Sequence, residues 1–428
     1  MNLRKPWVTV VSVAVAVIAA ACGGTGGGNN NSSSQTGTLT VWLMNGSAPQ
    51  SVIDEVNADF KAKYPNVTVK VEIQQWSDVT TKLDTAFQGS TPPDVMELGN
   101  TLVAKYAAAG ALLDITGKRA GFDNSATWLQ SLTDSCTQAG KLYCVPYYAG
   151  SRAIIYRKDF FASAGVAPPD SIDGLLTVGQ KLMTAHASDP NFSALYFPGK
   201  YWYGALPFVW DFGGDIATQS GGKWAGSLNS PSSQQGLTTL NNLVGKLSRA
   251  DKTGDEAKQD AAFAQGHIAM IIANGWEVGV ITDPKAGNPA LKDQLGAFPI
   301  PSHNAGQTAP VFLGGSDLGI SAKSKHQDLA DAWIATLTGN KHMTEMATVG
   351  GVIPNTTSML SLGTGINSTF YNAAKNSKFV PNSQNWASVE SANVLPDMLV
   401  KIFTRQQDVP TATNAASARI STILNGGG

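Results

Sequence analysis

Tryptophans standing beside carboxyl and amide groups are the side chains in this sequence best suited to chemistry. Asn274, Trp276 and Glu277 follow an apolar run over 268–273, and Trp76 follows a segment of alternating polarity. An indole offers a flat apolar face, and carboxyl and amide groups hydrogen-bond to hydroxyl groups. A sugar presents both C–H faces and hydroxyl groups, so this combination predicts non-covalent recognition of a carbohydrate.

Further candidates lie directly after predicted strands or within an aromatic segment. The polar ones are Asn45, Ser47, Glu97, Asn100, Ser316 and Asp317. Nine aromatic residues fall within 192–212, together with glycines and prolines, and of these Trp202 and Tyr203 are the best ligand candidates. Trp386 is another. For each aromatic residue packing in a core is the alternative, and for Arg152 the alternative to a ligand contact is a structural salt bridge.

Catalytic and metal-binding signatures are absent from the sequence. The five histidines are scattered, and no zinc-protease motif, nucleophile elbow or phosphate-binding loop is present. We expect no metal site and no cofactor. A glycoside hydrolase needs only two carboxylates at a defined separation, which Glu97, Glu277 and Asp317 offer. A secreted glycoside hydrolase is therefore one alternative function, and a cell-wall-binding adhesin lipoprotein is another.

Composition excludes other classes of partner. The chain has 428 residues with 30 basic and 31 acidic side chains, so its net charge is −1. Nucleic-acid binding needs a clustered basic surface, which this balance argues against. Hydrophobic residues make up 43% of the chain, which argues against disorder. The length suits two domains of ordinary size.

The first 22 residues have the pattern of an export signal. Arg4 and Lys5 precede an apolar run that ends in three alanines before Cys22. This order is typical of a secretory signal peptide, and a cysteine directly after small residues resembles the lipobox of bacterial lipoproteins. We expect a signal peptide over 1–21 and lipidation of Cys22. Ordinary cleavage and an uncleaved anchor are the alternatives.

An extracytoplasmic location follows from the next segments. Residues 22–37 are rich in Gly, Ser and Asn and predict a flexible tether. An anchor with a tether indicates a folded body held at the outer face of the cytoplasmic membrane. Cysteines oxidise outside the cytosol, and Cys136 and Cys144 flank a short predicted turn. We expect a disulfide between them, with two free thiols or a metal pair as alternatives.

The elements that position these residues alternate between strand and helix. Strands are predicted over 38–43, 67–73 and 94–98, and helices over 50–64, around 79–87 and over 102–109. This order is typical of a parallel α/β sheet, in which ligands bind at the carboxyl ends of the strands. The sheet therefore predicts that Asn45, Trp76, Glu97 and Asn100 come together.

Several segments resemble one known family. They are PPDVMELGN at 92–100, GALLDIT at 110–116, KLYCVPYYAGSRAIIYRKDFFASAG at 141–165, QGHIAMIIANGWE at 265–277, and 314–332. Their order and spacing resemble family 1 extracellular solute-binding proteins of ABC importers, the sugar-binding class related to maltose-binding protein. The resemblance spans 22 to about 357 and departs from the older signature at Arg157.

The resemblance implies a two-lobed α/β fold of the periplasmic-binding-protein-like type II class. The ligand cleft lies between lobes joined by a hinge. Carried onto this chain, lobe 1 is 38–146 plus 298–338, and lobe 2 is 147–297 plus 339–428. The family places a stacking tryptophan at Trp276. We expect Trp276, Trp202 and Glu97 to line one groove.

The implied function is that of a substrate-binding lipoprotein. It captures a neutral di- or oligosaccharide by lobe closure and delivers it to membrane permeases on separate chains. A monomer is expected. The Glu-Leu-Gly-Asn and Asn-Gly-Trp-Glu segments, at 97–100 and 274–277, resemble those of chito-oligosaccharide or cellobiose and xylobiose binders.

Overall fold

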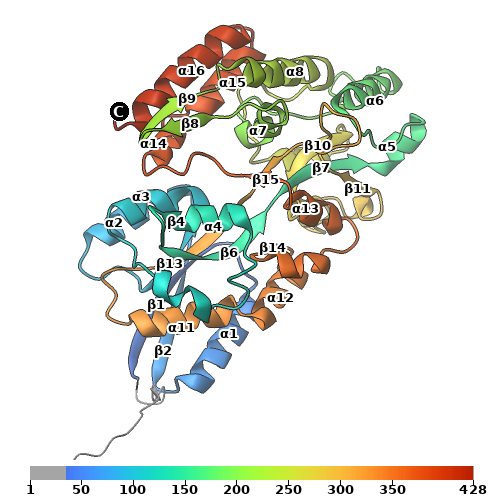
Figure 1. The fold of residues 1–428 in the computed structure, drawn as a ribbon. Coiled ribbons are helices and arrows are strands. Elements are labelled where there is room, and N and C mark those ends of the chain that lie inside the picture. Colours follow the sequence, from blue (N-terminus) through green and yellow to red (C-terminus); the bar gives the residue numbers. More distant parts are fainter. Residues whose placement is uncertain (1–34, 428) are drawn as a thin grey trace, which may run out of the picture.

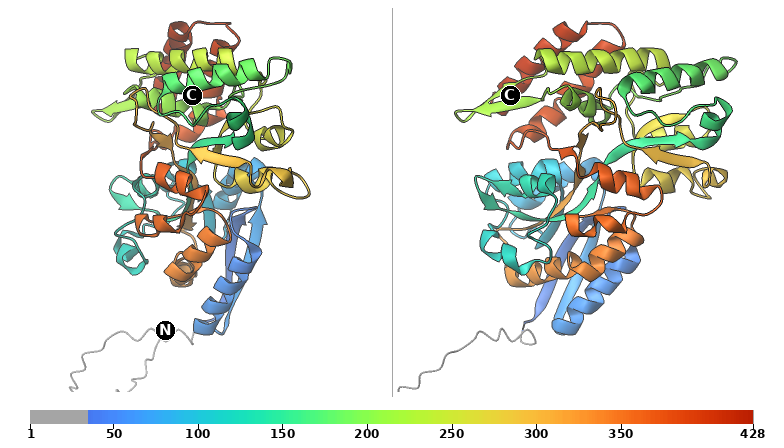
Figure 2. Two further views of the ribbon diagram at one scale, coloured as in Figure 1. Left: turned by 90° about the vertical axis from the view of Figure 1, so that its right-hand side faces the viewer. Right: turned by 45° about the vertical axis from the view of Figure 1, so that its right-hand side comes forward.

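The computed structural model describes residues 35–427, so the predicted signal peptide, Cys22 and most of the tether lie outside the described residues. Two lobes lie one above the other (Figure 1). The rotated views in Figure 2 show the described chain beginning at the far end of lobe 1 and ending on lobe 2. Between residues 35 and 427, no helix has both the length and the apolar character needed to cross a bilayer.

Lobe 1 is built on a six-stranded mixed sheet. Its strands, in spatial order, are β14 (Ile353–Pro354), β6 (Cys144–Gly150), β13 (Gly314–Ile320), β3 (Val95–Gly99), β1 (Gly37–Met44) and β2 (Val67–Gln74). β2, β1 and β3 run parallel, as the alternating pattern predicted. β13 runs antiparallel to both β3 and β6, because it enters from lobe 2 rather than through a helical crossover.

Helices cover both faces of this sheet. They are α1 (Gln50–Lys63), α2 (Val79–Gln88), α3 (Val103–Ala108), α4 (Gln130–Cys136), α11 (Gln327–Leu337) and α12 (Asn340–Thr348). Helical spacing puts Val52, Val56 and Phe60 on one face of α1, and all three are buried. α1 lies against α11 and α12, so these two helices, which come much later in the sequence, complete lobe 1.

Lobe 2 surrounds a smaller antiparallel sheet with helices. Its strands, in spatial order, are β10 (Met270–Asn274), β7 (Arg152–Arg157) and β11 (Leu295–Phe298). The helices are α5 (Lys158–Ser163), α6 (Ile172–Ala185), α7 (Trp202–Asp211), α8 (Pro231–Leu247), α9 (Gln259–Ala264), α10 (Glu277–Ile281), α13 (Asn367–Ala373), α14 (Trp386–Ser391), α15 (Val394–Phe403) and α16 (Val409–Leu424). A hairpin of β8 (Ala217–Ser220) and β9 (Lys223–Gly226) contacts α16.

Two of the crossings between the lobes are short extended segments. β6 leads directly into β7 at Gly150 and Ser151, and β12 (Val311–Phe312) leads through Leu313 into β13. β12 pairs with β15 (Ser377–Lys378), which follows α13. Each crossing is thus a single extended strand-to-strand connection, which suits a hinge between two rigid bodies.

The contacts place the lobe limits differently from the sequence-based expectation. Phe298 and Ile300 belong to the lobe 2 core, so the return to lobe 1 falls at Leu313 rather than at 298. The prolines of this stretch suggested a connection, but its apolar side chains are buried. α12 packs on α1 and β14, so lobe 1 continues past 339. The physical reason is that α11 and α12 bury their apolar faces on the same lobe.

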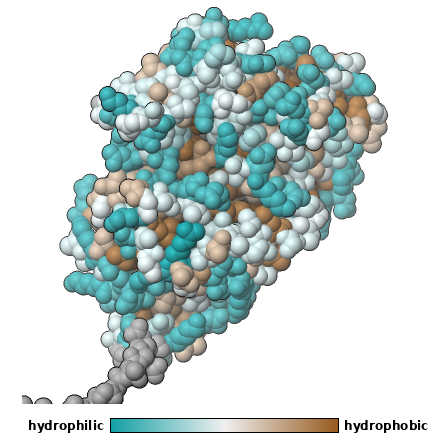
Figure 3. Space-filling view, in the orientation of Figure 1, coloured by the Kyte–Doolittle hydropathy of each residue, from teal (hydrophilic) through white to brown (hydrophobic). Residues whose placement is uncertain are grey.

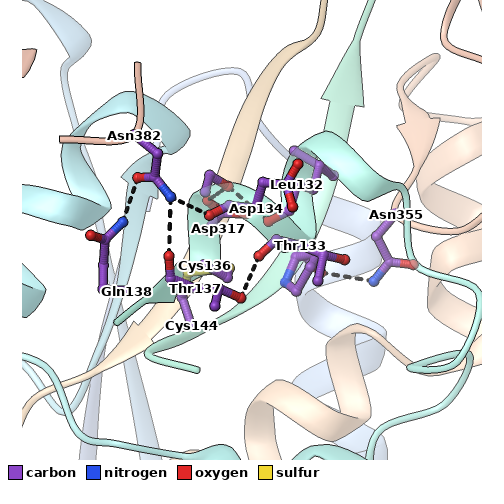
Figure 4. The surroundings of a disulfide bond; sticks show 12 residues. Leu132, Thr133, Asp134, Cys136, Thr137, Gln138, Cys144, Asp317, Asn355 and Asn382 are labelled. Atoms are coloured by element: carbon purple, nitrogen blue, oxygen red, sulfur yellow. Dashed lines mark hydrogen bonds between the residues drawn. A yellow bond between two sulfur atoms is a disulfide. The ribbon is translucent and has the colours of Figure 1, made fainter. Parts of the chain in front are cut away.

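The predicted disulfide between Cys136 and Cys144 is present, with both residues fully buried (Figure 4). Between them lies a small hairpin of β4 (Thr137–Gln138) and β5 (Lys141–Leu142). Its turn residues Ala139 and Gly140 both have positive φ, at 50° and 77°, as a tight two-residue hairpin turn requires.

Lobe 2 reaches back to lobe 1 beside this disulfide. Asn382 Nδ2 donates to the backbone oxygens of Asp134, at 2.6 Å, and Thr137, at 3.0 Å (Figure 4). The Ser131 and Ser377 hydroxyl groups lie 3.1 Å apart. The disulfide therefore rigidifies the part of lobe 1 on which this connection rests.

We expect replacement of Cys136 and Cys144 together by alanine to lower the free energy of unfolding by about 2.5 kcal/mol, because the short loop no longer constrains the unfolded chain. Urea unfolding measures the difference. Native protein unfolded in the presence of a reductant is the matched control and should lose a similar amount. Equal stabilities of the oxidised, reduced and substituted chains would contradict the expectation.

A candidate ligand-binding cleft

A cleft of about 730 Å³ lies between the two lobes. Seven of the predicted site residues line it, namely Asn45, Trp76, Asn100 and Ser316 from lobe 1 and Tyr203, Asn274 and Trp276 from lobe 2. Apolar residues show within the hollow between the lobes in Figure 3. The fold thus brings these seven residues to one cavity, and their contact with a ligand stays a prediction.

Parallel strand ends explain the lobe 1 half of the cleft. Asn45 directly follows β1, a 3-10 turn at Trp76–Asp78 follows β2, and another at Asn100–Leu102 follows β3. Parallel strands end at the same edge of a sheet, so the three segments meet there. Asn100 Nδ2 donates to the Leu313 oxygen at 3.0 Å, which ties this edge to a crossing segment.

The two tryptophans at the cleft are unusually exposed. Trp76 is 43% exposed on lobe 1 and Trp276 is 51% exposed on lobe 2. The other exposed large apolar side chains of residues 35–427 are Ile73, Val280 and Val349, and each is within four residues in sequence of a cleft-lining residue. The two exposed indoles line one cavity, and exposed apolar surface of this kind marks a candidate binding site.

Glu277 holds the loop that carries Trp276. Its Oε1 accepts from the backbone N–H of Asn274 at 2.8 Å and from Asn274 Nδ2 at 3.3 Å, and Oε2 accepts from Gln259 Nε2 at 2.9 Å. The side chain is buried, and this burial raises its pKa to about 7. Glu277 does not line this cleft, and its hydrogen bonds fix the loop that carries Trp276.

Glu97 on β3 plays the corresponding supporting role within lobe 1. It is fully buried, and its Oε2 accepts from the backbone N–H of Met44 at 2.8 Å and from Ser47 Oγ at 2.7 Å. The Tyr148 hydroxyl donates to Oε1 at 3.3 Å. Loss of hydration raises the pKa of this carboxyl group despite the bonds. Glu97 therefore positions the Asn45 loop and Tyr148, which lines the cleft.

Three more predicted ligand residues are buried away from the cleft. Asp317 is fully buried near the disulfide, where its Oδ2 accepts from Ser135 Oγ at 2.8 Å (Figure 4). Trp202 and Trp386 belong to the lobe 2 core. The expected common groove of Trp276, Trp202 and Glu97 thus holds for Trp276 only, because the other two side chains satisfy their contacts inside the protein.

The cleft also holds residues that the sequence did not reveal. They are Thr101, Phe312, Asn367, Phe370, Tyr371 and Glu390. Glu390 Oε2 accepts from Thr101 Oγ1 at 3.2 Å, which joins the two lobes, and burial raises the pKa of Glu390 to about 7. Most of these residues lie on crossing segments or short helices, where no periodic pattern marks them.

The candidate metal-ligand groups among the described residues lie outside the cleft. One is Cys136, Cys144 and Asp317, where the two sulfurs are bonded to each other. The other is Glu55, His342 and Glu345 on α1 and α12. Neither group shares a residue with the cleft lining.

Comparison with known proteins gives a match over most of the chain. A family model described as bacterial extracellular solute-binding protein matches residues 44–344. A diacetylchitobiose-binding protein of Streptomyces coelicolor, DasA, is 34% identical over 363 residues, which is 83% of this chain and 82% of that protein. A lactose-binding protein of Rhizobium radiobacter is 25% identical over 348 residues, covering 74% and 75% of the two chains.

Solved structures share the fold. The sugar-binding protein MalE of Xanthomonas citri superposes with a TM-score of 0.80 at 22% identity, covering 91% of this chain and 98% of that one. The GacH receptor of Streptomyces glaucescens, solved unliganded and with acarbose, gives a TM-score of 0.78 at 22% identity, covering 92% and 99%. These likenesses confirm the expected two-lobed architecture.

The pKa of Glu277 predicts a pH dependence of stability. Burial raises this pKa to about 7, so the folded chain binds more protons than the unfolded chain between pH 4.5 and pH 7. Its contribution to stability is therefore present at low pH and is lost as the pH rises through this window. We expect Glu277→Gln to remove a decline of up to about 3 kcal/mol, measured by urea unfolding across the window. Parallel pH profiles of the native and substituted chains would contradict this.

Proposed function

This chain belongs to the family of bacterial extracellular solute-binding proteins, and we propose that it captures a neutral di- or oligosaccharide for an ABC importer. The single observation that supports this proposal most strongly is the pair of exposed indoles, Trp76 and Trp276, on opposite walls of one cleft. A flat apolar face on each lobe suits a sugar ring, which has an apolar face on either side. The relatives DasA and the lactose-binding protein are named for saccharide ligands.

The charges in the cleft favour an uncharged ligand. Among the described residues that line it, Arg152 is the only guanidinium or ammonium group and Glu390 is the only carboxyl group. The rest of the lining is amide, hydroxyl, aromatic, aliphatic and backbone. Hydroxyl groups of a saccharide both donate and accept hydrogen bonds, so such a lining satisfies them without an ion pair.

The estimated affinity suits reversible capture. Stacking on an aromatic ring contributes about 1–3 kcal/mol per base in nucleic-acid complexes, and sugar stacking is near the low end. We propose a dissociation constant of micromolar order, about −8 kcal/mol, because an importer must both capture its ligand and release it.

Closure of the lobes supplies the signal to the transporter. A ligand shifts the chain toward the closed state only if it binds that state more tightly. Contact with Trp76 on one lobe and Trp276 on the other provides this difference, because both contacts form fully when the lobes approach. The single-strand crossings at Ser151 and Leu313 are the proposed hinge.

Binding without catalysis fits the carboxyl groups. A glycoside hydrolase places two carboxyl groups at the scissile bond, and Glu390 is the only carboxyl group among the described cleft residues. Saccharide recovered intact after long incubation excludes hydrolysis. An adhesin binds polymer and shows no thermal shift with small saccharides.

For the export signal we propose anchoring by a lipid on Cys22, on the extracellular face of the cytoplasmic membrane. The chain then acts as a monomer that delivers ligand to separate permease chains. We expect the native protein in the membrane fraction and a Cys22→Ser variant in the medium. Equal release of the two proteins would contradict lipidation.

Trp76→Ala and Trp276→Ala are each expected to weaken saccharide binding about fivefold or more, because each removes one stacking surface of about 1 kcal/mol. Calorimetric titration, after a thermal-shift screen of N,N′-diacetylchitobiose, cellobiose, xylobiose and maltose, measures the change. Trp224→Ala on β9, away from the cleft, is the matched control and should leave the affinity within twofold.

The same thermal-shift screen also tests whether the ligand is a saccharide. A shift with a peptide, an amino acid or a polyamine, and with no saccharide, would overturn it. Undiminished saccharide binding by both cleft variants would show that the indoles are not the stacking surfaces.

A further inference from the structure

A second, smaller pocket opens beside the cleft in lobe 2. Its volume is about 330 Å³, and it shares Arg152, Asn274 and Trp276 with the cleft. The rest of its lining is Asp255, Glu256, Ala257, Asp260 and Glu277. Trp276 therefore stands at the boundary of the two cavities, and a ring stacked on its indole has substituents within reach of the side pocket.

Arg152 lies at this boundary, and one nitrogen of its guanidinium group, Nη2, forms no hydrogen bond within the described residues. Its side chain is only 7% exposed, Nε donates to the Tyr201 hydroxyl at 3.0 Å, and Nη1 donates to the Phe312 oxygen at 3.4 Å. The guanidinium also lies over the Tyr203 ring, 4.8 Å from its centroid. Among residues 35–427 no carboxylate oxygen lies within 4.0 Å of it, and Nη2 has no partner. The salt bridge considered for Arg152 is thus not formed.

Glu256 provides the opposite group in the same pocket. Asp255 Oδ1 accepts from the Ala257 backbone N–H at 3.1 Å, and both oxygens of Glu277 are engaged. The Glu256 carboxyl group accepts from its own backbone N–H but from no other described residue, and its charge interacts with that of Arg152 without closing an ion pair. The pocket therefore holds an unused donor and an unused acceptor that face one cavity.

We propose that this side pocket binds the acetamido group of an N-acetylated sugar whose ring stacks on Trp276. Arg152 donates to the amide carbonyl oxygen, and Glu256 accepts from the amide N–H. The inference rests on the proposed saccharide function and adds the substituent that the site selects.

Other substituents match the pocket less well. A carboxylate would lie beside the carboxyl groups of Asp255, Glu256 and Asp260. A free ammonium group would pair with these carboxyl groups, but it has no acceptor for the donors of Arg152. A lone hydroxyl group has to make both contacts through one oxygen, which limits the gap between donor and acceptor that it can bridge. An amide has its acceptor and its donor on different atoms, so it can satisfy both.

Calorimetric titration of the native mature chain and three variants tests the proposal. The probes are N,N′-diacetylchitobiose, its de-acetylated dimer and cellobiose. Glu256→Met removes the acceptor, and Arg152→Lys keeps the charge but loses the guanidinium fork. Asp173→Asn on α6 is the matched control, because it removes one negative charge from lobe 2 at a residue that lines neither cavity. Urea unfolding of each variant shows whether the fold is retained.

We expect the native chain to bind the acetylated dimer at least tenfold more tightly than cellobiose or the de-acetylated dimer. Glu256→Met should weaken acetylated-dimer binding tenfold or more and change cellobiose binding less than twofold. Arg152→Lys should weaken acetylated-dimer binding tenfold or more and cellobiose binding by a smaller factor, because Arg152 also lines the cleft. Asp173→Asn should leave both unchanged.

The measurements distinguish failure of the acetamido site from failure of the proposed saccharide function. Equal native affinity for the three dimers, or equal losses for acetylated dimer and cellobiose in Glu256→Met, would overturn the acetamido site and leave the saccharide function standing. No binding of any saccharide by the native chain would overturn both.

Discussion

The shape of the cleft depends on two buried carboxyl groups, those of Glu97 and Glu277, which hydrogen-bond to the loops that line it. Burial of a carboxylate is unfavourable unless hydrogen bonds replace its hydration. Glu97 accepts from the loop after β1 and from Tyr148, and Glu277 accepts from both amide groups of Asn274 and from Gln259. Each bond set ties a loop to the strand beside it. The loops can then present indole and amide groups to the ligand in fixed positions.

In this arrangement the residues that hold the loops in place are different from the residues proposed to contact the ligand. The carboxyl groups that would be reactive in a hydrolase are used to hold loops, and the cleft itself is lined mainly by aromatic, amide, hydroxyl and backbone groups. The division is mirrored in the two lobes, with Glu97 under the Trp76 side and Glu277 under the Trp276 side. Movement between the lobes then brings two pre-formed half-sites together rather than assembling a site from flexible parts.

The sequence predicted those parts of the site that depend on local order. The residues after parallel strands come together because strand ends meet at one edge, which is why Asn45, Trp76 and Asn100 line one cavity. Burial is set by distant segments, so the sequence did not show that Glu97 would turn inward to Met44 and Ser47. α7 begins at Trp202, and neighbouring residues on a helix point about 100° apart. Tyr203 faces the cleft and Trp202 the core for that reason.

A crystal structure of the mature chain with a bound di- or oligosaccharide tests the central claim most directly. The account predicts sugar rings packed between Trp76 and Trp276, with Glu97 and Glu277 still bonded to their loops and forming no hydrogen bond to the ligand. A saccharide seated elsewhere, or one bonded directly to Glu97 or Glu277, would contradict it.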